Sequence, residues 1–361
     1  MKRLYEETTA LGFVAKNRFL RSATWENMTT EDGHLTERIY DIYKSLAENE
    51  VGTIITGYAN VVKEEQPNPG MMGIYDDSFI VEYQKLTDII HKYKARIVLQ
   101  VAYGGTKTTY NVGERVILAP SVVPEQSTNT VGKEMTFDEI QYIIRAFAKA
   151  AKRAKKAGFD GIEIHAAHTY LINQFLSPYY NRRLDEYGGS LENRMRFLKE
   201  IYDAMRKEVG KEYPIWVKLT ATEFFQGGLS FTETREICKA VEAWGMQAIE
   251  LSGNVHGKAK SMVGQAFDGY EIEAEGYFYR YGEIVSNEVD IPVITVGGFR
   301  KLESIEEIIE KTNIQYVALS RPLLAEPDLL VRWKHGDKSP AKCVRCSKCR
   351  TQDGNYCVIF Q

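Results

Sequence analysis

Eight short apolar runs recur along this chain, and their alternation with longer amphipathic segments constrains the fold more than any other feature. Most of the runs are continuously apolar and rich in β-branched residues, which is typical of strands covered on both faces. They span residues 19–22, 51–56, 97–102, 161–165, 215–219, 248–251, 292–296 and 316–320.

The segments between the runs carry apolar residues at helical spacing. Several begin at a side chain that favours a helix start: Thr136 precedes Phe137, with Glu139 three residues on, and Ser190 precedes Leu191. The predicted helices span 37–49, 79–93, 137–157, 191–209, 232–244, 278–287 and 304–311.

Strand and helix repeated eight times predict a closed parallel TIM (β/α)8 barrel, an α/β fold. A doubly wound sheet is the alternative, and it is disfavoured because no G-x-G-x-x-G follows any of the runs. Only the end of the chain breaks the pattern. We therefore expect a barrel over residues 1–338 and a short cysteine-rich C-terminal tail over residues 339–361.

Charge and hydropathy exclude several classes of partner. The net charge is −3 and no block of basic residues stands out, which disfavours a nucleic-acid partner. No apolar run reaches the roughly 18 residues that a membrane span needs. Residues 1–10 lack the apolar segment of a secretory signal. These features predict a soluble protein of the cytoplasm.

Two histidines, His165 and His168, stand at the end of the fourth run. Barrel chemistry sits at the carboxyl ends of the strands, so both are candidate site residues. Their spacing allows two metal ligands, or one packed and one surface histidine, or two donors directed at one oxyanion. The chain has only six histidines, which weakens the second interpretation.

A phosphate site is predicted where the seventh and eighth runs end, because barrels commonly hold phosphate there. Gly297 and Gly298 follow the seventh run, Ser320 ends the eighth and Arg321 follows it. Glycines free backbone N–H groups, and an arginine adds a bidentate charge. The alternative is a tight turn and a surface arginine.

Several of these strings together resemble the Old Yellow Enzyme family of NAD(P)H:flavin oxidoreductases. The resemblance runs from Lys16 to Trp333 and rests on HAAHTY at 165–170, DEYGGSLENR at 185–194, KNR at 16–18 and LSRPL at 319–323. It implies an FMN-dependent (β/α)8 barrel that uses NADH or NADPH to reduce the C=C bond of an α,β-unsaturated carbonyl compound, an enone or enoate.

The resemblance also implies catalytic roles. His165 and His168 match the pair that holds the substrate carbonyl oxygen and so prepares the alkene for hydride from flavin N5. Tyr170 matches the proton donor. A phenol, with a pKa near 10, is neutral at pH 7 and has a proton to give.

Further positions match flavin contacts of the family. Gln100 matches the glutamine at the flavin pyrimidine edge. Lys218 falls where an arginine is usual, so the positive charge is kept but the forked pair of guanidinium donors is lost. Trp25 stands where many members carry cysteine or threonine, which points to the subgroup of enoate and 2,4-dienoyl-CoA reductases. The implied cofactor-binding residues are Ala23, Thr24, Trp25, Tyr58, Gln100, His165, Lys218, Gly297, Gly298, Ser320 and Arg321.

Four of the five cysteines lie in the tail: Cys343, Cys346, Cys349 and Cys357. The resembled subgroup carries an iron–sulfur cluster directly after the barrel, and close spacing of three cysteines is a cluster signature. A [4Fe-4S] cluster, a zinc ion and free reduced thiols all remain open.

Two alternative functions accompany the leading prediction. The chain could be the flavin subunit of an electron-transfer assembly that relies on a partner reductase. It could also be a flavin-free barrel with Lys218 as a Schiff-base lysine, but the paired histidines and Gln100 would then have no purpose. We expect a small-molecule substrate and a homo-oligomer.

Overall fold

A computed structural model describes residues 2–253, 264–267 and 269–360. Eight parallel strands form a ring in the order β2-β1-β14-β13-β10-β9-β8-β5, and β2 pairs with β5 to close it. The barrel strands are β1 Phe19–Arg21, β2 Thr53–Ile55, β5 Arg96–Ala102, β8 Gly161–Ala166, β9 Ile215–Thr220, β10 Ile249–Ser252, β13 Val293–Val296 and β14 Tyr316–Leu319. The predicted TIM barrel is confirmed.

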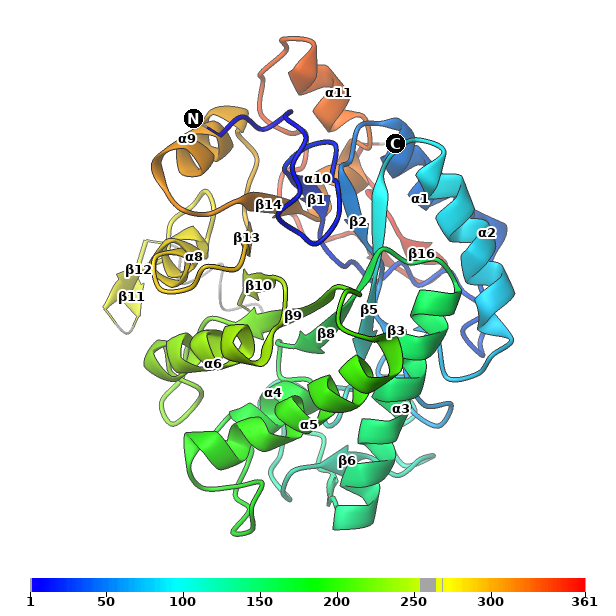
Figure 1. Cartoon of the computed structure of the whole chain (residues 1–361), viewed down its shortest axis with the longest axis vertical. Helices are drawn as coiled ribbons and strands as arrows, with labels where there is room; N and C mark the ends of the chain where they lie inside the picture. Colours follow the sequence, from blue (N-terminus) through cyan, green and yellow to red (C-terminus); the bar gives the residue numbers. More distant parts are fainter. Residues whose placement is uncertain (1, 254–263, 268, 361) are drawn as a thin grey trace.

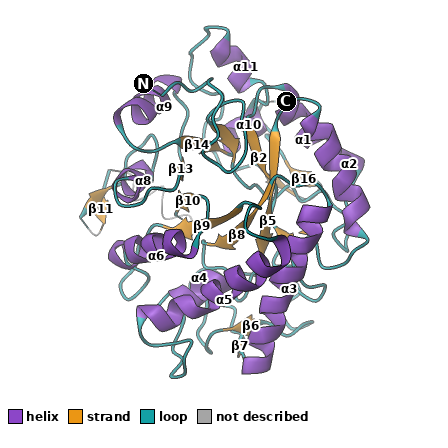
Figure 2. Ribbon diagram, in the orientation of Figure 1, coloured by secondary structure: helices purple, strands orange, loops and turns teal. Residues whose placement is uncertain are grey.

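Helices surround the ring of strands, as Figures 1 and 2 show. The seven predicted helices are present, with ends shifted by a few residues. They are α1 Glu37–Glu48, α2 Phe79–His91, α3 Phe137–Lys156, α5 Leu191–Val209, α6 Phe231–Trp244, α8 Tyr279–Ser286 and α9 Leu302–Lys311. Three short helices were not predicted: α4 Leu171–Leu176, α10 Arg321–Ala325 and α11 Leu329–Lys334.

Helix starts follow the side chains that cap them. Thr136 and Glu139 form a reciprocal capping box at α3. Ser190 accepts a hydrogen bond from the backbone N–H of Asn193 at α5. Such caps satisfy backbone donors that the first helical turn leaves free. A second capping box at Ser230 starts α6 one residue before its predicted start.

The barrel interior changes character along its axis. At the amino end it is apolar: Leu11 and Leu20 belong to a buried cluster with Trp216, and the Phe13 ring lies 5.5 Å from the Trp216 ring. Towards the carboxyl ends of the strands it is polar, with buried Glu163 among the interior side chains. The apolar end is closed by packing, so chemistry is left to the carboxyl rim.

Small two-residue strands decorate the loops. They are β3 Ala59–Asn60, β4 Met72–Gly73, β6 Leu118–Ala119, β7 Lys133–Glu134, β11 Ala266–Phe267, β12 Tyr270–Glu271, β15 Arg350–Thr351 and β16 Gly354–Asn355. The β15–β16 hairpin, in the cysteine-rich tail, docks on the loop after β1. Asn355 Nδ2 donates to the Trp25 carbonyl at 2.6 Å, and Asn27 Nδ2 donates to the Thr351 carbonyl at 3.1 Å.

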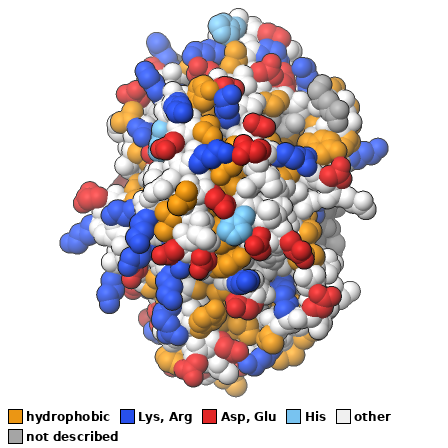
Figure 3. Space-filling model, turned by 90° about the vertical axis from the view of Figure 1, so that its right-hand side faces the viewer, with side chains coloured by type: hydrophobic (Ala, Val, Ile, Leu, Met, Phe, Trp, Pro, Cys, Tyr) orange, Lys and Arg blue, Asp and Glu red, His pale blue; other side chains and the backbone are white. Residues whose placement is uncertain are grey.

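The outer surface carries charges of both signs. On the face shown in Figure 3, acidic and basic side chains are interspersed, with apolar side chains in small groups between them. Among the described helices, none combines the length and the apolar character that crossing a membrane would require.

Candidate active site

The carboxyl ends of the barrel strands surround an open cavity of about 620 Å³, here called the rim cavity. It brings together seven of the predicted site residues: Ala23, His168, Lys218, Gly297, Ser320, Arg321 and Cys349. Its other described lining residues are Ser22, Ser252, Gly253, Tyr277, Phe278, Val296, Ser347 and Arg350. Ser347 and Arg350, like Cys349, come from the tail, and the sequence did not predict that these two line the cavity.

His165 and His168 lie next to each other at the end of β8, with ring centroids 5.0 Å apart. Burial, followed by neighbouring positive charge, lowers both pKa values well below the ordinary histidine value, so both rings are neutral at pH 7. His165 Nδ1 accepts the Ala167 N–H at 3.2 Å, which places the ring proton on Nε2. His165 is therefore built as a neutral hydrogen-bond donor.

A sharp backbone turn directs His168. His168 and Thr169 both have φ of 61°, a left-handed conformation that is uncommon for residues with a Cβ. The His168 N–H donates to Thr220 Oγ1, and its Nε2 lies 2.9 Å from Ser252 Oγ. The contact with Thr220 of β9 thus fixes the backbone of His168, and the contact with Ser252 of β10 fixes its ring. Backbone strain of this kind is typical of functional sites.

Tyr170 begins the helix that follows this turn and lies beside His165, with ring centroids 4.7 Å apart. Burial raises the pKa of Tyr170 to about 12, so the phenol keeps its proton. Asn68 Nδ2 donates to Tyr58 Oη at 2.6 Å and to Tyr170 Oη at 3.4 Å. Asn68 therefore holds the two tyrosines together, and the sequence reading missed it.

Lys218 belongs to a buried network of charged and polar side chains inside the barrel. Its Nζ is 2.8 Å from Glu250 Oε2 and donates to Ser22 Oγ at 2.9 Å. Ser22 Oγ in turn donates to Glu250 Oε1 at 2.7 Å. Glu250 and Ser22 thus hold the ammonium group in place below the rim cavity.

A second buried carboxyl lies beside this network. Gln100 Nε2 donates to Glu163 Oε2 at 2.6 Å. Burial and the nearby Glu250 raise the pKa of Glu163 well above its usual value. Gln100 Oε1 and Glu163 Oε1 are both buried and have no hydrogen-bond partner among the described residues. Such orphaned atoms are expected where a bound group completes the site.

The predicted phosphate residues line a second cavity of about 110 Å³, here called the phosphate pocket. Gly297 and Gly298 have φ of 115° and 80°. A Cβ at Gly298 would stand 2.9 Å from the Tyr277 ring. Because these two glycines have no side chain, a ligand can approach the backbone closely at both positions.

Positive charge surrounds the phosphate pocket. Arg300, Arg321 and Arg345 all line it. Arg345, from the tail, was not predicted, and its Nη2 pairs with Glu275 at 2.8 Å. Arg321 follows Ser320 in the first turn of α10 and donates to Ser347 Oγ at 3.5 Å. Three guanidinium groups beside two glycines suit a phosphate.

The loop after β1 lines the rim cavity through Ala23. Thr24 Oγ1 lies 2.8 Å from Ser320 Oγ, and Trp25 Nε1 donates to the Pro69 carbonyl at 2.9 Å. The first of these contacts ties the loop to Ser320, which lines both the rim cavity and the phosphate pocket. The predicted strand-one segment is therefore brought to the site, although Trp25 faces the loop that carries Pro69.

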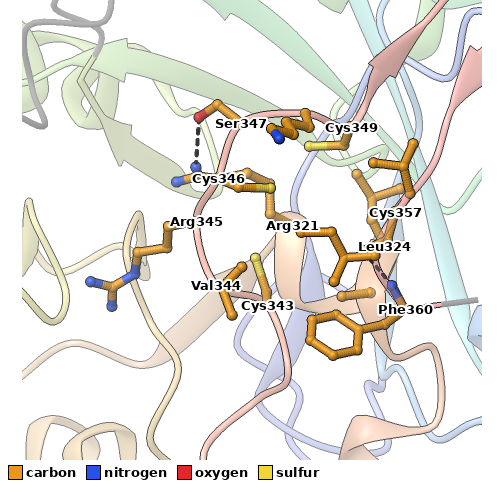
Figure 4. Close-up of a pocket in the computed structure, with 14 residues that line it drawn as sticks. Arg321, Leu324, Cys343, Val344, Arg345, Cys346, Ser347, Cys349, Cys357 and Phe360 are labelled. Atoms are coloured by element: carbon orange, nitrogen blue, oxygen red, sulfur yellow. Dashed lines mark hydrogen bonds between the residues drawn. The ribbon is translucent and has the colours of Figure 1, made fainter.

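The four tail cysteines line one pocket, here called the cysteine pocket, shown in Figure 4. Arg321, Leu324 and Phe360 are among its other lining residues. In the described part of the chain, no three His, Cys, Asp or Glu side chains are placed to share a single metal ion. The zinc alternative therefore gains no support. Burial raises the pKa of the Cys349 thiol.

Comparison with known proteins places the chain among flavin enzymes. Residues 10–339 match the NADH:flavin oxidoreductase / NADH oxidase family. The chain is 35% identical to an NADH oxidase of Thermoanaerobacter brockii, over 95% of this chain and 52% of that protein. It is 32% identical to a cinnamate reductase of Clostridium sporogenes, over 99% of this chain and 57% of that protein.

A solved structure gives the same result for the fold. The 2-naphthoyl-CoA reductase complex superposes with a TM-score of 0.83 at 25% identity, over 94% of this chain and 53% of that chain. The chain thus spans about half the length of these relatives. It belongs to the NADH:flavin oxidoreductase / NADH oxidase family, which confirms the Old Yellow Enzyme relationship.

Proposed function

We propose that this chain is an FMN-dependent NAD(P)H oxidoreductase that reduces the C=C bond of α,β-unsaturated carbonyl compounds. The observation that carries the proposal is the pairing of two neutral imidazoles, His165 and His168, with a protonated phenol, Tyr170, beside the rim cavity. The similarity to a cinnamate reductase and to 2-naphthoyl-CoA reductase supports an unsaturated carbonyl substrate.

The residues of the rim fit FMN in three places. The phosphate pocket suits the phosphate group, with Gly297, Gly298 and Arg321 as its holders. The unpartnered Gln100 Oε1 is a buried acceptor that suits a ring N–H. The Lys218 ammonium suits a ring edge that gains negative charge on reduction. When bound, FMN supplies hydride chemistry.

The side chains of this chain would then divide the remaining work. His165 donates from Nε2–H to the substrate carbonyl oxygen and stabilises the negative charge that develops there. His168, fixed by Ser252, directs its ring to the same place. Tyr170 gives its proton to the α-carbon and is held by Asn68 while it does so.

Rapid-mixing kinetics under anaerobic conditions tests the proposal. The purified protein should carry bound FMN, and NADH or NADPH should bleach its visible absorbance. An α,β-unsaturated ketone or ester should then restore the absorbance and yield the saturated product. A protein that stays colourless after incubation with FMN would refute the proposal, as would reduced flavin that no activated alkene reoxidises.

Arg321 should decide the affinity for FMN. Removing a charge-assisted contact to phosphate costs about 1.5–3 kcal/mol, so Arg321→Ala should weaken FMN binding by about 10–100-fold. Arg321→Lys keeps the positive charge but lacks the forked pair of guanidinium donors, so it should lose less FMN affinity. Flavin fluorescence during dilution measures the dissociation constant. Unchanged FMN affinity in Arg321→Ala would place the phosphate elsewhere.

We further propose that the cysteine pocket holds a [4Fe-4S] cluster. A cluster attaches each thiolate to its own iron, so its ligands need not meet around one ion. The support is that Cys343, Cys346, Cys349 and Cys357 all line one pocket that also has apolar walls. Arg321, Ser347 and Cys349 line both the cysteine pocket and the rim cavity, so a cluster held by these cysteines would be a neighbour of the rim cavity.

Iron and sulfide analysis of protein purified without oxygen tests the cluster. The intact chain should hold about four irons per chain, and Cys346→Ser should lose most of them. Cys238→Ala is the matched control, since Cys238 is buried in α6 and should leave the iron content unchanged. Zinc in place of iron, or neither metal, would contradict the cluster.

A further inference from the structure

One arginine of the tail stands at the rim cavity without a role in the chemistry described so far. Arg350 lines this cavity together with His168 and Lys218. Its side chain is exposed, and its Cζ lies 5.8 Å from the centre of the Trp25 ring. A planar guanidinium over an aromatic ring is a favourable and orienting contact.

The backbone of Arg350 is held firmly in this position. Arg350 begins the β15–β16 hairpin, and its neighbour Thr351 accepts a hydrogen bond from Asn27. On the other strand, the Asn355 N–H donates to the Glu26 carbonyl at 2.6 Å. The hairpin turns at Gly354, where φ is 132° and a Cβ would collide with Met28. The hairpin is thus fixed to the loop after β1, which carries Trp25.

The charge of Arg350 is not neutralised within the described part of the chain, where its side chain has no ion pair and no hydrogen bond. Among the described residues that line the rim cavity, none is an Asp or Glu. The other two cations there are accounted for: Lys218 is bound to Glu250, and Arg321 also lines the phosphate pocket. An exposed cation at an acid-free cavity wall favours an anionic ligand.

The field of Arg350 reaches the reacting groups. Its positive charge acts to lower the pKa values of Tyr58 and Tyr170, against the larger effect of burial, which raises both. The same charge lowers the pKa of Lys107, after the larger effect of burial. Arg350 thus acts electrostatically on both tyrosines, and it lines the rim cavity.

We propose that Arg350 binds a carboxylate of the substrate and makes this enzyme prefer unsaturated carboxylates over uncharged unsaturated carbonyl compounds. This inference rests on the proposed function, because it concerns the molecule that Tyr170 protonates. Arg350 acts by binding and takes no part in bond making. A guanidinium with free donors matches the two oxygens of a carboxylate, a geometry that a lysine does not reproduce.

A matched pair of substrates tests the preference: cinnamate and its methyl ester, which differ in charge at one oxygen. Arg350→Gln should lower kcat/KM for the acid by about 10–100-fold, mainly through KM, and change the ester less than twofold. Arg350→Lys should recover part of the loss. Lys348→Gln is the control, because it removes an exposed positive charge two residues away and should not change the acid-to-ester ratio.

A binding measurement separates this inference from the proposed function. Titration of the oxidised flavoprotein with 4-hydroxybenzoate and with 4-hydroxybenzamide, followed by flavin absorbance, reports affinity without turnover. We expect Arg350→Gln to weaken the benzoate alone. Charge-selective binding without alkene reduction would sink the proposed function and keep the inference. Equal losses for charged and uncharged ligands, or no loss, would overturn the role of Arg350.

Discussion

Replacing Tyr170 with phenylalanine should slow the reduction of an activated alkene by about 10²–10⁴-fold, the usual span of general acid catalysis. The phenol is buried and its pKa is raised to about 12, so it is a proton donor that does not ionise near neutral pH. Flavin reduction by nicotinamide needs no proton on carbon and should stay near normal. Rapid mixing of each half-reaction measures the two steps separately.

Tyr58 provides the matched control for this variant. Its ring meets the Tyr170 ring edge-on at 5.5 Å, and Asn68 donates to both hydroxyls. Tyr58→Phe removes a similar hydroxyl from the same cluster and should leave most of the alkene reduction intact. If Tyr58→Phe loses the alkene step and Tyr170→Phe does not, Tyr58 is the donor. Equal loss of both half-reactions in Tyr170→Phe would show that Tyr170 is not a dedicated donor.

Replacing Lys218 with methionine should lower the free energy of unfolding by about 3–5 kcal/mol, because it leaves the Glu250 carboxylate buried without its partner. Both side chains are almost wholly buried, at 4% and 0% exposure, and Nζ and Oε2 lie 2.8 Å apart. Glu163 adds a second carboxyl to the same interior. Urea unfolding of flavin-free protein measures the effect without the contribution of bound FMN.

Two further variants test whether the buried, unpaired Glu250 carboxylate causes the loss of stability. Adding Glu250→Gln to Lys218→Met removes the stranded charge and should restore part of the stability. Lys199→Met breaks a similar pair with Asp203 at the surface, at 36% and 54% exposure, and should cost less than about 1 kcal/mol. A loss below about 1 kcal/mol in Lys218→Met would mean that Glu250 is solvated or protonated in the folded state.

The barrel could be predicted because each of its strands is a separate local signal. For example, the apolar runs 215–219 and 292–296, each bounded by helices, predict the strands β9 and β13. The short helices were not predicted because five or six residues make fewer than two helical turns, too few for apolar residues to recur on one face. At α10 the chain turns helical at Arg321, directly after Ser320, with a proline in its first turn.

The site was predictable only where a motif carried it. His165, His168 and Tyr170 lie together because a single turn after β8 holds all three. Glu163 and Glu250 were passed over as parts of apolar strands, since the sequence does not show which way a strand residue faces in a closed barrel. Arg350 reaches the rim through the tail hairpin, whose Asn355 bonds to Trp25 across 330 residues of sequence. Arg345 reaches the phosphate pocket beside Glu275, its ion-pair partner 70 residues away. No local pattern predicts either contact.

The closure of the barrel has a consequence for how the protein is made. β1 pairs with β14, so the first strand to leave the ribosome has to wait for the last one before its edge is covered. Lys2 adds a clasp there through hydrogen bonds to the carbonyls of Thr312 and Ile314. Contacts of this sequence separation slow folding and keep strand edges exposed during synthesis. Because Ser320 and Arg321 follow β14, the proposed phosphate pocket is incomplete until all eight barrel strands have been synthesised, so FMN held there would assist folding only after that point.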